Sequence, residues 1–237
     1  MTSPASPVRW DATLREAALP TVDDPGGPVV VLSAHPDDEV LGVGAWLAGQ
    51  VGRRLHLVVA TDGEQSHPGS PTVTPDQLRT VRRRELAEAF AVLGHPHVRT
   101  THLGLRDAAL PDDREPLTRL LQPLLQDAAV VLAPYEHDGH GDHDVLGAVA
   151  RELVPAGTTL WRYPVWRWTR STPDVGPDWL QGAALLPSSA GAAQQKAAAL
   201  RAFRSQLEPW SDHPADQVVV TPALLEHALT APEVVLT

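Results

Sequence analysis

The sequence predicts an α/β protein with a Rossmann-like, doubly wound and mostly parallel sheet that carries helices on both faces. Short apolar runs rich in β-branched residues alternate with longer segments of helical apolar spacing, the pattern of parallel strands joined by crossover helices. The runs are apolar at nearly every position, as expected of strands buried on both faces. With 237 residues, 43% of them hydrophobic, the chain can build a sizeable core. We therefore expect residues 1–237 to form a single domain.

Each expected element is bounded by turn-forming residues or by helix start and stop signals. The predicted strands span residues 28–34, 54–61, 97–103, 128–136 and 158–168. The predicted helices span residues 39–52, 76–94, 114–127, 144–154, 188–207 and 222–232. The helix at 76–94 has Asp76 as its expected N-cap, Gly94 as its stop and a regular apolar stripe between them. Stretches rich in Gly, Ser and Pro predict loops at 62–75 and 171–180.

Composition excludes several classes of function. The 29 Asp and Glu residues outnumber 19 Lys and Arg, which gives a formal net charge of -10 and argues against nucleic acid as a partner. The absence of cysteine excludes disulfides, thiolate metal ligands and a cysteine nucleophile. No signal sequence is evident and no segment approaches 18 consecutive apolar residues, so we expect a cytoplasmic protein without a membrane partner. The oligomeric state stays open, and a homo-oligomer is compatible with the sequence.

Two polar clusters follow predicted strands. The segment "HPDDE" (35–39) follows the first strand, and "HDGHGDH" (137–143) follows the fourth. In a doubly wound sheet with the common strand order 3-2-1-4, the loops after these strands are neighbours at the crevice where ligands bind. We therefore expect the two clusters to form one site.

The residue types in these clusters suit a divalent metal. His35, Asp38 and His143 make a two-histidine, one-carboxylate set, which zinc or another first-row metal such as Fe²⁺ accepts with positions left for water and substrate. Asp37 is then the expected general base. His140, if protonated, could stabilise an oxyanion or protonate a leaving amine, and Asp142 could orient a histidine.

These clusters also have simpler explanations. Acidic residues at a strand-to-helix junction can cap the helix and interact with its dipole, which accounts for Glu39 and for one of the two aspartates but not for His35. A histidine-rich loop can be an ordinary solvated segment. The sequence argues against a dinucleotide-binding site because carboxylates stand where a phosphate-binding glycine-rich turn is required. Gly42 and Gly44 are instead expected to allow close helix packing. The remaining histidines that we considered are expected to be structural or exposed: His56, His95, His97, His213 and His227.

The motifs together resemble a known family. "AHPDDE" after the first strand with "HGDH" after a later one is similar to the PIG-L or LmbE-like N-acetylglucosaminyl deacetylases, which include mycothiol and bacillithiol pathway enzymes. Supporting similarity comes from "ATDGE", "RRRELAEAFAVLG" and "KAAALRAFRSQL", so that the resemblance covers about residues 28–210.

The resemblance implies a zinc-dependent amide hydrolase on a Rossmann-like sheet that removes N-acetyl groups from amino sugars or their conjugates. It assigns His35, Asp38 and His143 to the metal and Asp37 to the general base. His140 matches the histidine that assists the tetrahedral intermediate, and Arg82 matches an arginine that contacts substrate.

Two alternative functions remain at this point. One is an amidase that cleaves a larger amide conjugate, and the other is a catalytically silent carbohydrate-binding relative. The segment at 161–179 is richer in tryptophan than we expect from the sugar-thiol enzymes. Its tryptophans are core or interface residues, or they stack on substrate; they are Trp161, Trp166, Trp168 and Trp179.

Overall fold

A computed structural model describes residues 10–172 and 178–237 of the protein. Within these residues, seven strands form one sheet in the order β3-β2-β1-β4-β5-β7-β6. The strands are β1 (Val29–Ser33), β2 (Leu55–Val59), β3 (Arg99–His102), β4 (Val130–Pro134), β5 (Thr159–Tyr163), β6 (Ala183–Leu185) and β7 (Val234–Leu236). The first five are parallel, whereas β7 pairs antiparallel with β5 and with β6. The predicted sheet, including the order 3-2-1-4 of its first four strands, is confirmed.

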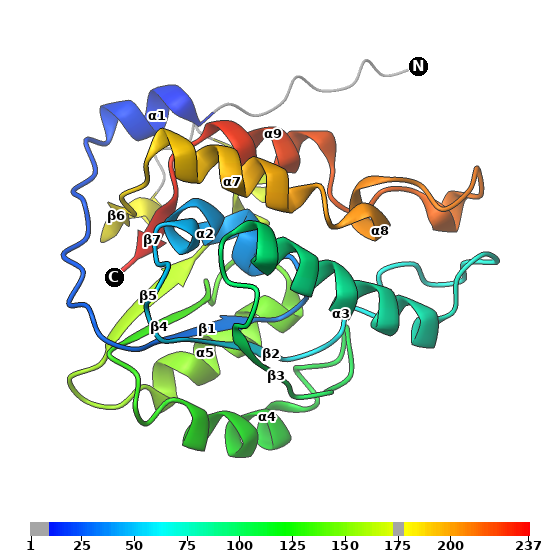
Figure 1. The fold of residues 1–237 in the computed structure, drawn as a ribbon, viewed down its shortest axis with the longest axis horizontal. Helices are drawn as coiled ribbons and strands as arrows, with labels where there is room; N and C mark the ends of the chain where they lie inside the picture. Colours follow the sequence, from blue (N-terminus) through cyan, green and yellow to red (C-terminus); the bar gives the residue numbers. More distant parts are fainter. Residues whose placement is uncertain (1–9, 173–177) are drawn as a thin grey trace.

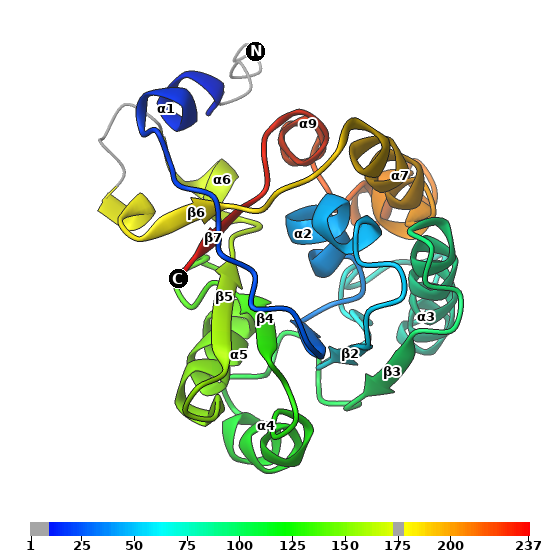
Figure 2. The same cartoon turned by 60° about the vertical axis from the view of Figure 1, so that its left-hand side comes forward.

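Helices cover both faces of this sheet (Figure 1). On one face lie α2 (Asp38–Ala48), α3 (Pro75–Val92), α7 (Ala190–Leu200) and α9 (Pro222–Thr230), and on the other lie α4 (Arg114–Leu121) and α5 (Gly141–Leu153). The shorter helices are α1 (Asp11–Glu16), α6 (Arg167–Arg170) and α8 (Arg204–Leu207), with 3₁₀ turns η1 (Gln122–Leu124), η2 (Asp178–Leu180) and η3 (Pro214–Asp216). Figure 2 shows α6, β6 and β7 beyond β5, at one edge of the sheet. Among the described residues, none of the helices has the length and apolar character needed to cross a bilayer.

The strand sequence explains why two hydrophobic layers form. Successive side chains of a strand point to opposite faces, and β1 is apolar at four consecutive positions. Val29 and Val31 pack in the layer that contains α2, α3 and α7, whereas Val30 and Leu32 pack in the layer that contains α4 and α5. The sheet is therefore buried on both faces, and its open positions lie at the ends of its strands.

Several boundaries differ from the prediction at the ends of elements. The N-cap of α3 is Thr74 rather than Asp76: the Thr74 hydroxyl accepts a hydrogen bond from the Gln77 backbone, and the Gln77 side chain accepts one from the Thr74 backbone. The predicted strand at 158–168 ends at Tyr163 because Pro164 has no N–H for the ladder.

The C-terminal part of the chain differs more. The helix predicted at 188–207 is two helices, because Phe203 leaves the helical conformation (φ -80°, ψ 53°) while its ring is buried in the core. The helix predicted at 114–127 continues only as η1 beyond α4, at Pro123. Strands β6 and β7 have three residues each, too few for a periodic pattern to identify. The loop predicted at 171–180 lies partly outside the described residues.

The tryptophans of 161–179 are mostly packing residues. Trp161 is buried and packs edge-to-face against Trp46, with 5.5 Å between the ring centroids. Trp168 and Trp179 both contact Trp10 in a separate aromatic cluster. Trp166 differs because it lines the cavity described below.

Candidate metal centre

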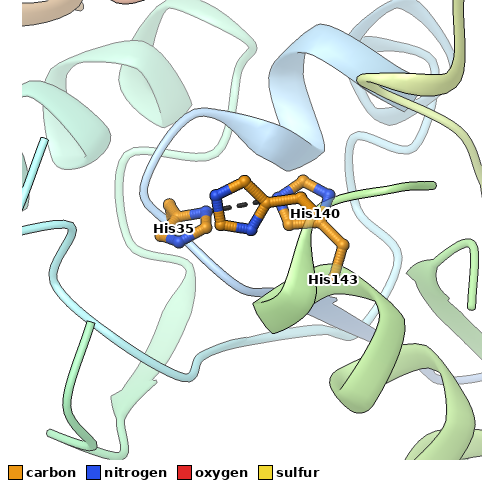
Figure 3. Close-up of side chains that lie close together, drawn as sticks. All are labelled: His35, His140 and His143. Carbon is orange, nitrogen blue, oxygen red and sulfur yellow. Dashed lines mark hydrogen bonds between the residues drawn. The ribbon is translucent and has the colours of Figure 1, made fainter. Parts of the chain in front are cut away.

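The two predicted clusters meet at the carboxyl ends of the neighbouring strands β1 and β4. The loop after β1 carries His35, and the start of α5 carries His140 and His143. Figure 3 shows these three imidazoles close together, although His35 is more than 100 positions from the other two in the chain. The sheet order thus converts two distant sequence motifs into one cluster.

Three side chains converge on one point with the spacing that a metal requires. His143 Nε2 lies 3.2 Å from His35 Nδ1 and 3.2 Å from Asp38 Oδ1, and His35 Nδ1 lies 3.4 Å from Asp38 Oδ2. Ligands placed tetrahedrally at about 2.0–2.1 Å from zinc lie roughly 3.3 Å from one another. All three side chains are buried. The donor types, spacing and burial therefore fit a divalent cation bound by two histidines and one carboxylate.

Carboxylates on the outer side of each imidazole orient these donors. Asp138 Oδ2 lies 2.8 Å from His143 Nδ1, so that nitrogen carries the proton and Nε2 is left to face the cluster. Asp107 and Asp142 lie 3.1 and 3.3 Å from His35 Nε2, which leaves His35 Nδ1 facing the same point. Such carboxylate–histidine pairs are the usual support of metal-binding histidines.

Two of these supporting residues, Asp107 and Asp138, were not predicted from the sequence. Asp138 is separated from His143 by five positions, and that short spacing within "HDGHGDH" was the available signal. Asp107 lies in the loop before α4, and nothing in its local sequence indicates a role. Asp142 also accepts hydrogen bonds from the backbone of Ala108 and Leu110, which ties this loop to the start of α5.

The electrostatics of the cluster favour positive charge at its centre. Burial lowers the pKa of His143, but Asp38 and Asp138 outweigh it and raise the pKa to about 9. At His35, burial is likewise outweighed by Asp38, Asp107 and Asp142, which raise the pKa well above its usual value. A divalent cation among these residues supplies the positive charge that the carboxylates favour, and its binding must release protons.

Asp37 lies beside the cluster but faces a different neighbour. Its Oδ2 is 3.1 Å from an Arg82 nitrogen, and Arg82 also donates to the backbone oxygens of Gly63 and Pro36. Burial raises the pKa of Asp37 to about 6, while the Arg82 charge acts to lower it. Asp37 makes no side-chain capping bond to α2, so helix capping does not explain it. Asp37 lines the same cavity as His35 and Asp38.

His140 completes the ring of polar groups. Its ring centroid lies 4.9 Å from those of His35 and His143, and its buried Nδ1 has no hydrogen-bond partner among the described residues. Burial, followed by the charges of His35 and His143, lowers the pKa of His140 to about 4. The imidazole is therefore neutral at pH 7, with one nitrogen free to bond a ligand.

A cavity of about 110 Å³ opens beside these groups. It is lined by His35, Asp37, Asp38, His140 and Arg82, together with residues from other segments that include Ser66, Trp166 and Gln206. Trp166 stacks on His140 with 6.4 Å between ring centroids. The neighbours of Arg82 on α3 have other roles: Arg83 pairs with Asp62, and Arg84 is exposed.

The five histidines that were expected to be structural or exposed lie outside the site. His56 bonds the Thr101 hydroxyl and His95 bonds the Leu47 carbonyl, whereas His97 and His213 are exposed. His227 packs against Trp168.

The histidine–carboxylate cluster is buried between the ends of β1 and β4, where the strand order of the sheet reverses. The protein is therefore an α/β protein with a candidate metal centre at the usual ligand-binding position of such sheets. Residues 30–154 match the PIG-L family, described as GlcNAc-PI de-N-acetylase. Because this match covers more than half of the chain, the protein belongs to that family. The resemblance inferred from "AHPDDE" and "HGDH" is thus confirmed.

Two curated relatives match part of the chain. The first is the probable N-acetyl-alpha-D-glucosaminyl L-malate deacetylase 2 of Bacillus subtilis (strain 168), 34% identical over an alignment of 136 residues that covers 53% of this chain and 60% of the relative. The second is the 1D-myo-inositol 2-acetamido-2-deoxy-alpha-D-glucopyranoside deacetylase of Kineococcus radiotolerans, 32% identical over an alignment of 174 residues that covers 59% of this chain and 48% of the relative. The matches thus span 60% and 48% of the lengths of these two relatives.

A solved structure shares the fold. The N,N'-diacetylchitobiose deacetylase from Pyrococcus horikoshii aligns with a TM-score of 0.58 and 23% identity, over 77% of this chain and 71% of that one. At this level of identity the likeness concerns the fold alone.

Proposed function

We propose that the protein is a metal-dependent N-deacetylase that hydrolyses the N-acetyl group of an amino sugar or an amino-sugar conjugate. The observation that carries the proposal is the convergence of His35 Nδ1, His143 Nε2 and the Asp38 carboxylate at 3.2–3.4 Å, with Asp37 beside them in one cavity. A silent binding protein has no need of this arrangement. Membership of the PIG-L family supports the same reaction.

The metal site is assigned to His35, Asp38 and His143. Zn²⁺ is the proposed ion, and Fe²⁺ suits the same ligands. When bound, such an ion lowers the pKa of a coordinated water towards about 7 and polarises a carbonyl group. Asp107, Asp138 and Asp142 hold the two imidazoles with the correct nitrogen towards the ion.

Asp37 is the proposed general base. It takes a proton from the attacking water and delivers it to the leaving amine, so that one carboxyl group serves both halves of the reaction. Arg82 holds this carboxylate in place through the 3.1 Å contact. Arg82 is also proposed to contact the substrate, because it lines the cavity.

His140 is assigned to the acyl oxygen. Its neutral imidazole can donate one N–H to the negative charge that develops on this oxygen, and no group in residues 10–172 or 178–237 bonds its Nδ1. The ring is held by Trp166, whose indole stacks on it beside the cavity. Trp166 is thus placed to contact the sugar or its substituent.

The proposed substrate is a small molecule with an N-acetylglucosamine unit. Both curated relatives are named for deacetylation of such compounds. We propose no nucleic-acid or membrane partner for the reaction.

The test combines metal content with product analysis. Purified protein is expected to hold about one equivalent of zinc or iron, and a His143→Ala variant is expected to lose most of it. Wild-type protein is then assayed for acetate and free amine on a panel of N-acetylglucosamine conjugates. Release of a longer acid would indicate an amidase instead, and absence of metal after reconstitution would contradict the hydrolytic mechanism.

A further inference from the structure

Helix α2, which carries Asp38 in its first turn, is interrupted in its middle. Val43 has φ -137° and ψ 21°, so the helix consists of two short parts. The first part leads from the candidate metal centre, and the second contains the core residues Trp46 and Leu47. Asp38 belongs to the first part and faces His143 on α5.

A buried ion pair occupies the interruption. Lys196 of α7 donates to the Leu41 carbonyl at 2.9 Å, and Glu233 accepts the backbone N–H groups of Ala45 and Trp46 at 2.7 Å each. Lys196 and Glu233 bond each other at 2.8 Å. In a continuous helix, the Ala45 N–H would bond the Leu41 carbonyl. The two side chains therefore take the places of the missing helical partners.

Burying this ion pair costs desolvation free energy, which suggests that the interruption of α2 has a function. Lys196 is 4% exposed and Glu233 is 5% exposed, and burying two charges costs several kcal/mol per ion, on the order of what their attraction returns. Lys196 is also the only lysine of the chain.

The glycines of α2 allow this approach. A Cβ on Gly42 would lie 2.4 Å from the Tyr163 ring, and one on Gly44 would lie 3.1 Å from Lys196 Cγ. The expectation that these glycines permit close packing is confirmed. The Tyr163 hydroxyl in turn bonds the Leu32 carbonyl of β1 at 2.6 Å, which ties the first part of α2 to the strand that leads to His35.

We infer that Lys196 and Glu233 are positioning residues for the metal centre: they hold α2 interrupted so that Asp38 meets His35 and His143. This inference rests on the proposed function. Without the pair, the free Leu41 carbonyl and Ala45 N–H can bond each other, which straightens α2 and moves Asp38 away from His143.

The main test is the double variant Lys196→Met/Glu233→Met. Replacing a buried ion pair with apolar residues of similar size usually preserves stability, so the variant isolates the geometry of α2. We expect its zinc affinity, measured by competition with a chromophoric chelator, to fall about 10- to 100-fold, as for other residues that support metal ligands. Hydrogen exchange at the Ala45 and Trp46 amides is expected to change as their acceptor changes.

A second variant and a control keep the test decisive. Glu233→Gln removes the charge but keeps the size, and it should weaken zinc binding. If the double variant does not fold, the zinc affinity of Glu233→Gln is used to test the inference. Leu121→Ala is the control, because it opens a cavity in the core on the opposite face of the sheet and should leave zinc affinity unchanged.

The outcomes separate the two proposals. Wild-type zinc affinity in a folded double variant, or in Glu233→Gln where the double variant does not fold, overturns the positioning role alone. A wild-type protein that binds no divalent metal contradicts the proposed function and the positioning role together. An equal loss of affinity in the Leu121→Ala control would mean that any loss of stability weakens the site, which also overturns the inference.

Discussion

The substitution Asp138→Asn tests the support of the candidate metal centre most directly. The Asp138 carboxylate is fully buried and accepts four hydrogen bonds: Oδ2 accepts from His143 Nδ1 and the Trp166 backbone, and Oδ1 accepts from the Val165 and Arg167 backbones, all at 2.8–2.9 Å. An asparagine replaces one oxygen with NH₂. Whichever way the amide turns, two of the four donors then face another donor.

The expected magnitude follows from these bonds. Each hydrogen bond to a charged group contributes about 1.5–3 kcal/mol, so losing two costs roughly 3–6 kcal/mol of unfolding free energy. This is a large share of the 5–15 kcal/mol typical of folded proteins. Because His143 loses its fixed orientation in one of the two amide positions, metal affinity is also expected to fall about 10- to 100-fold.

The assay pairs urea unfolding with zinc competition for the variant and for Asp144→Asn. Asp144 lies in the first turn of α5, next to His143, and among the described residues its side chain accepts a hydrogen bond only from the Gly139 backbone, near the surface. Its substitution should therefore change the unfolding free energy by about 1 kcal/mol or less and leave zinc affinity intact. Wild-type stability and wild-type affinity in Asp138→Asn would refute the assigned role.

Three further predictions follow from the site and from its surroundings. Removal of metal with a chelator should abolish acetate release and one equivalent of Zn²⁺ or Fe²⁺ should restore it; full turnover by metal-free protein would contradict the mechanism. Asp37→Asn should keep its metal while kcat falls about 10²- to 10⁴-fold, and near-normal kcat would exclude Asp37 as the base. Burial acts to raise the pKa of Asp216, but hydroxyl donors on Ser211, Ser70 and Thr72 outweigh it and lower the pKa to about 2. Since the folded pKa lies below the unfolded value of about 3.9, the stabilisation is complete above that value and is lost as pH falls towards 2. Urea unfolding of wild type and Asp216→Asn should therefore differ at pH 7 and converge near pH 2, and a difference independent of pH would contradict this.

The sequence predicted the part of the fold that local patterns determine. The buried strands at 28–34 and 128–136 are apolar at nearly every position, and each is followed by a helix, so the parallel sheet follows from the spacing. Strands β6 and β7 were missed because a strand of three residues is too short to show an apolar periodicity. Their pairing also depends on the packing of distant segments. The break between α7 and α8 was missed because the Ala-rich sequence has high helix propensity, which the burial of Phe203 overrides.

The site divides in the same way. The convergence of His35, Asp38 and His143 could be predicted because residues of ligand type occur at short spacing after strands whose order could be inferred. Their role as metal ligands stays a prediction. Asp107 and the partners of Lys196 could not be found, because each contact joins elements whose relative position depends on the complete fold. The family resemblance assigned Arg82 to substrate contact. Its ion pair with Asp37 is a second role, which no local pattern in the sequence indicates.

The backbone at Asp37 explains how adjacent acidic residues can take different tasks. Asp37 has φ 152°, a conformation rare for residues other than glycine, which costs on the order of 1–3 kcal/mol. This conformation directs Asp37 towards Arg82 on α3, whereas Asp38, the next residue, faces His143 on α5. Arg82 offsets the cost by bonding both the Asp37 carboxylate and the Pro36 carbonyl. A relaxed turn would direct the two carboxylates differently, so the local strain is what separates a proposed base from a proposed ligand one residue away.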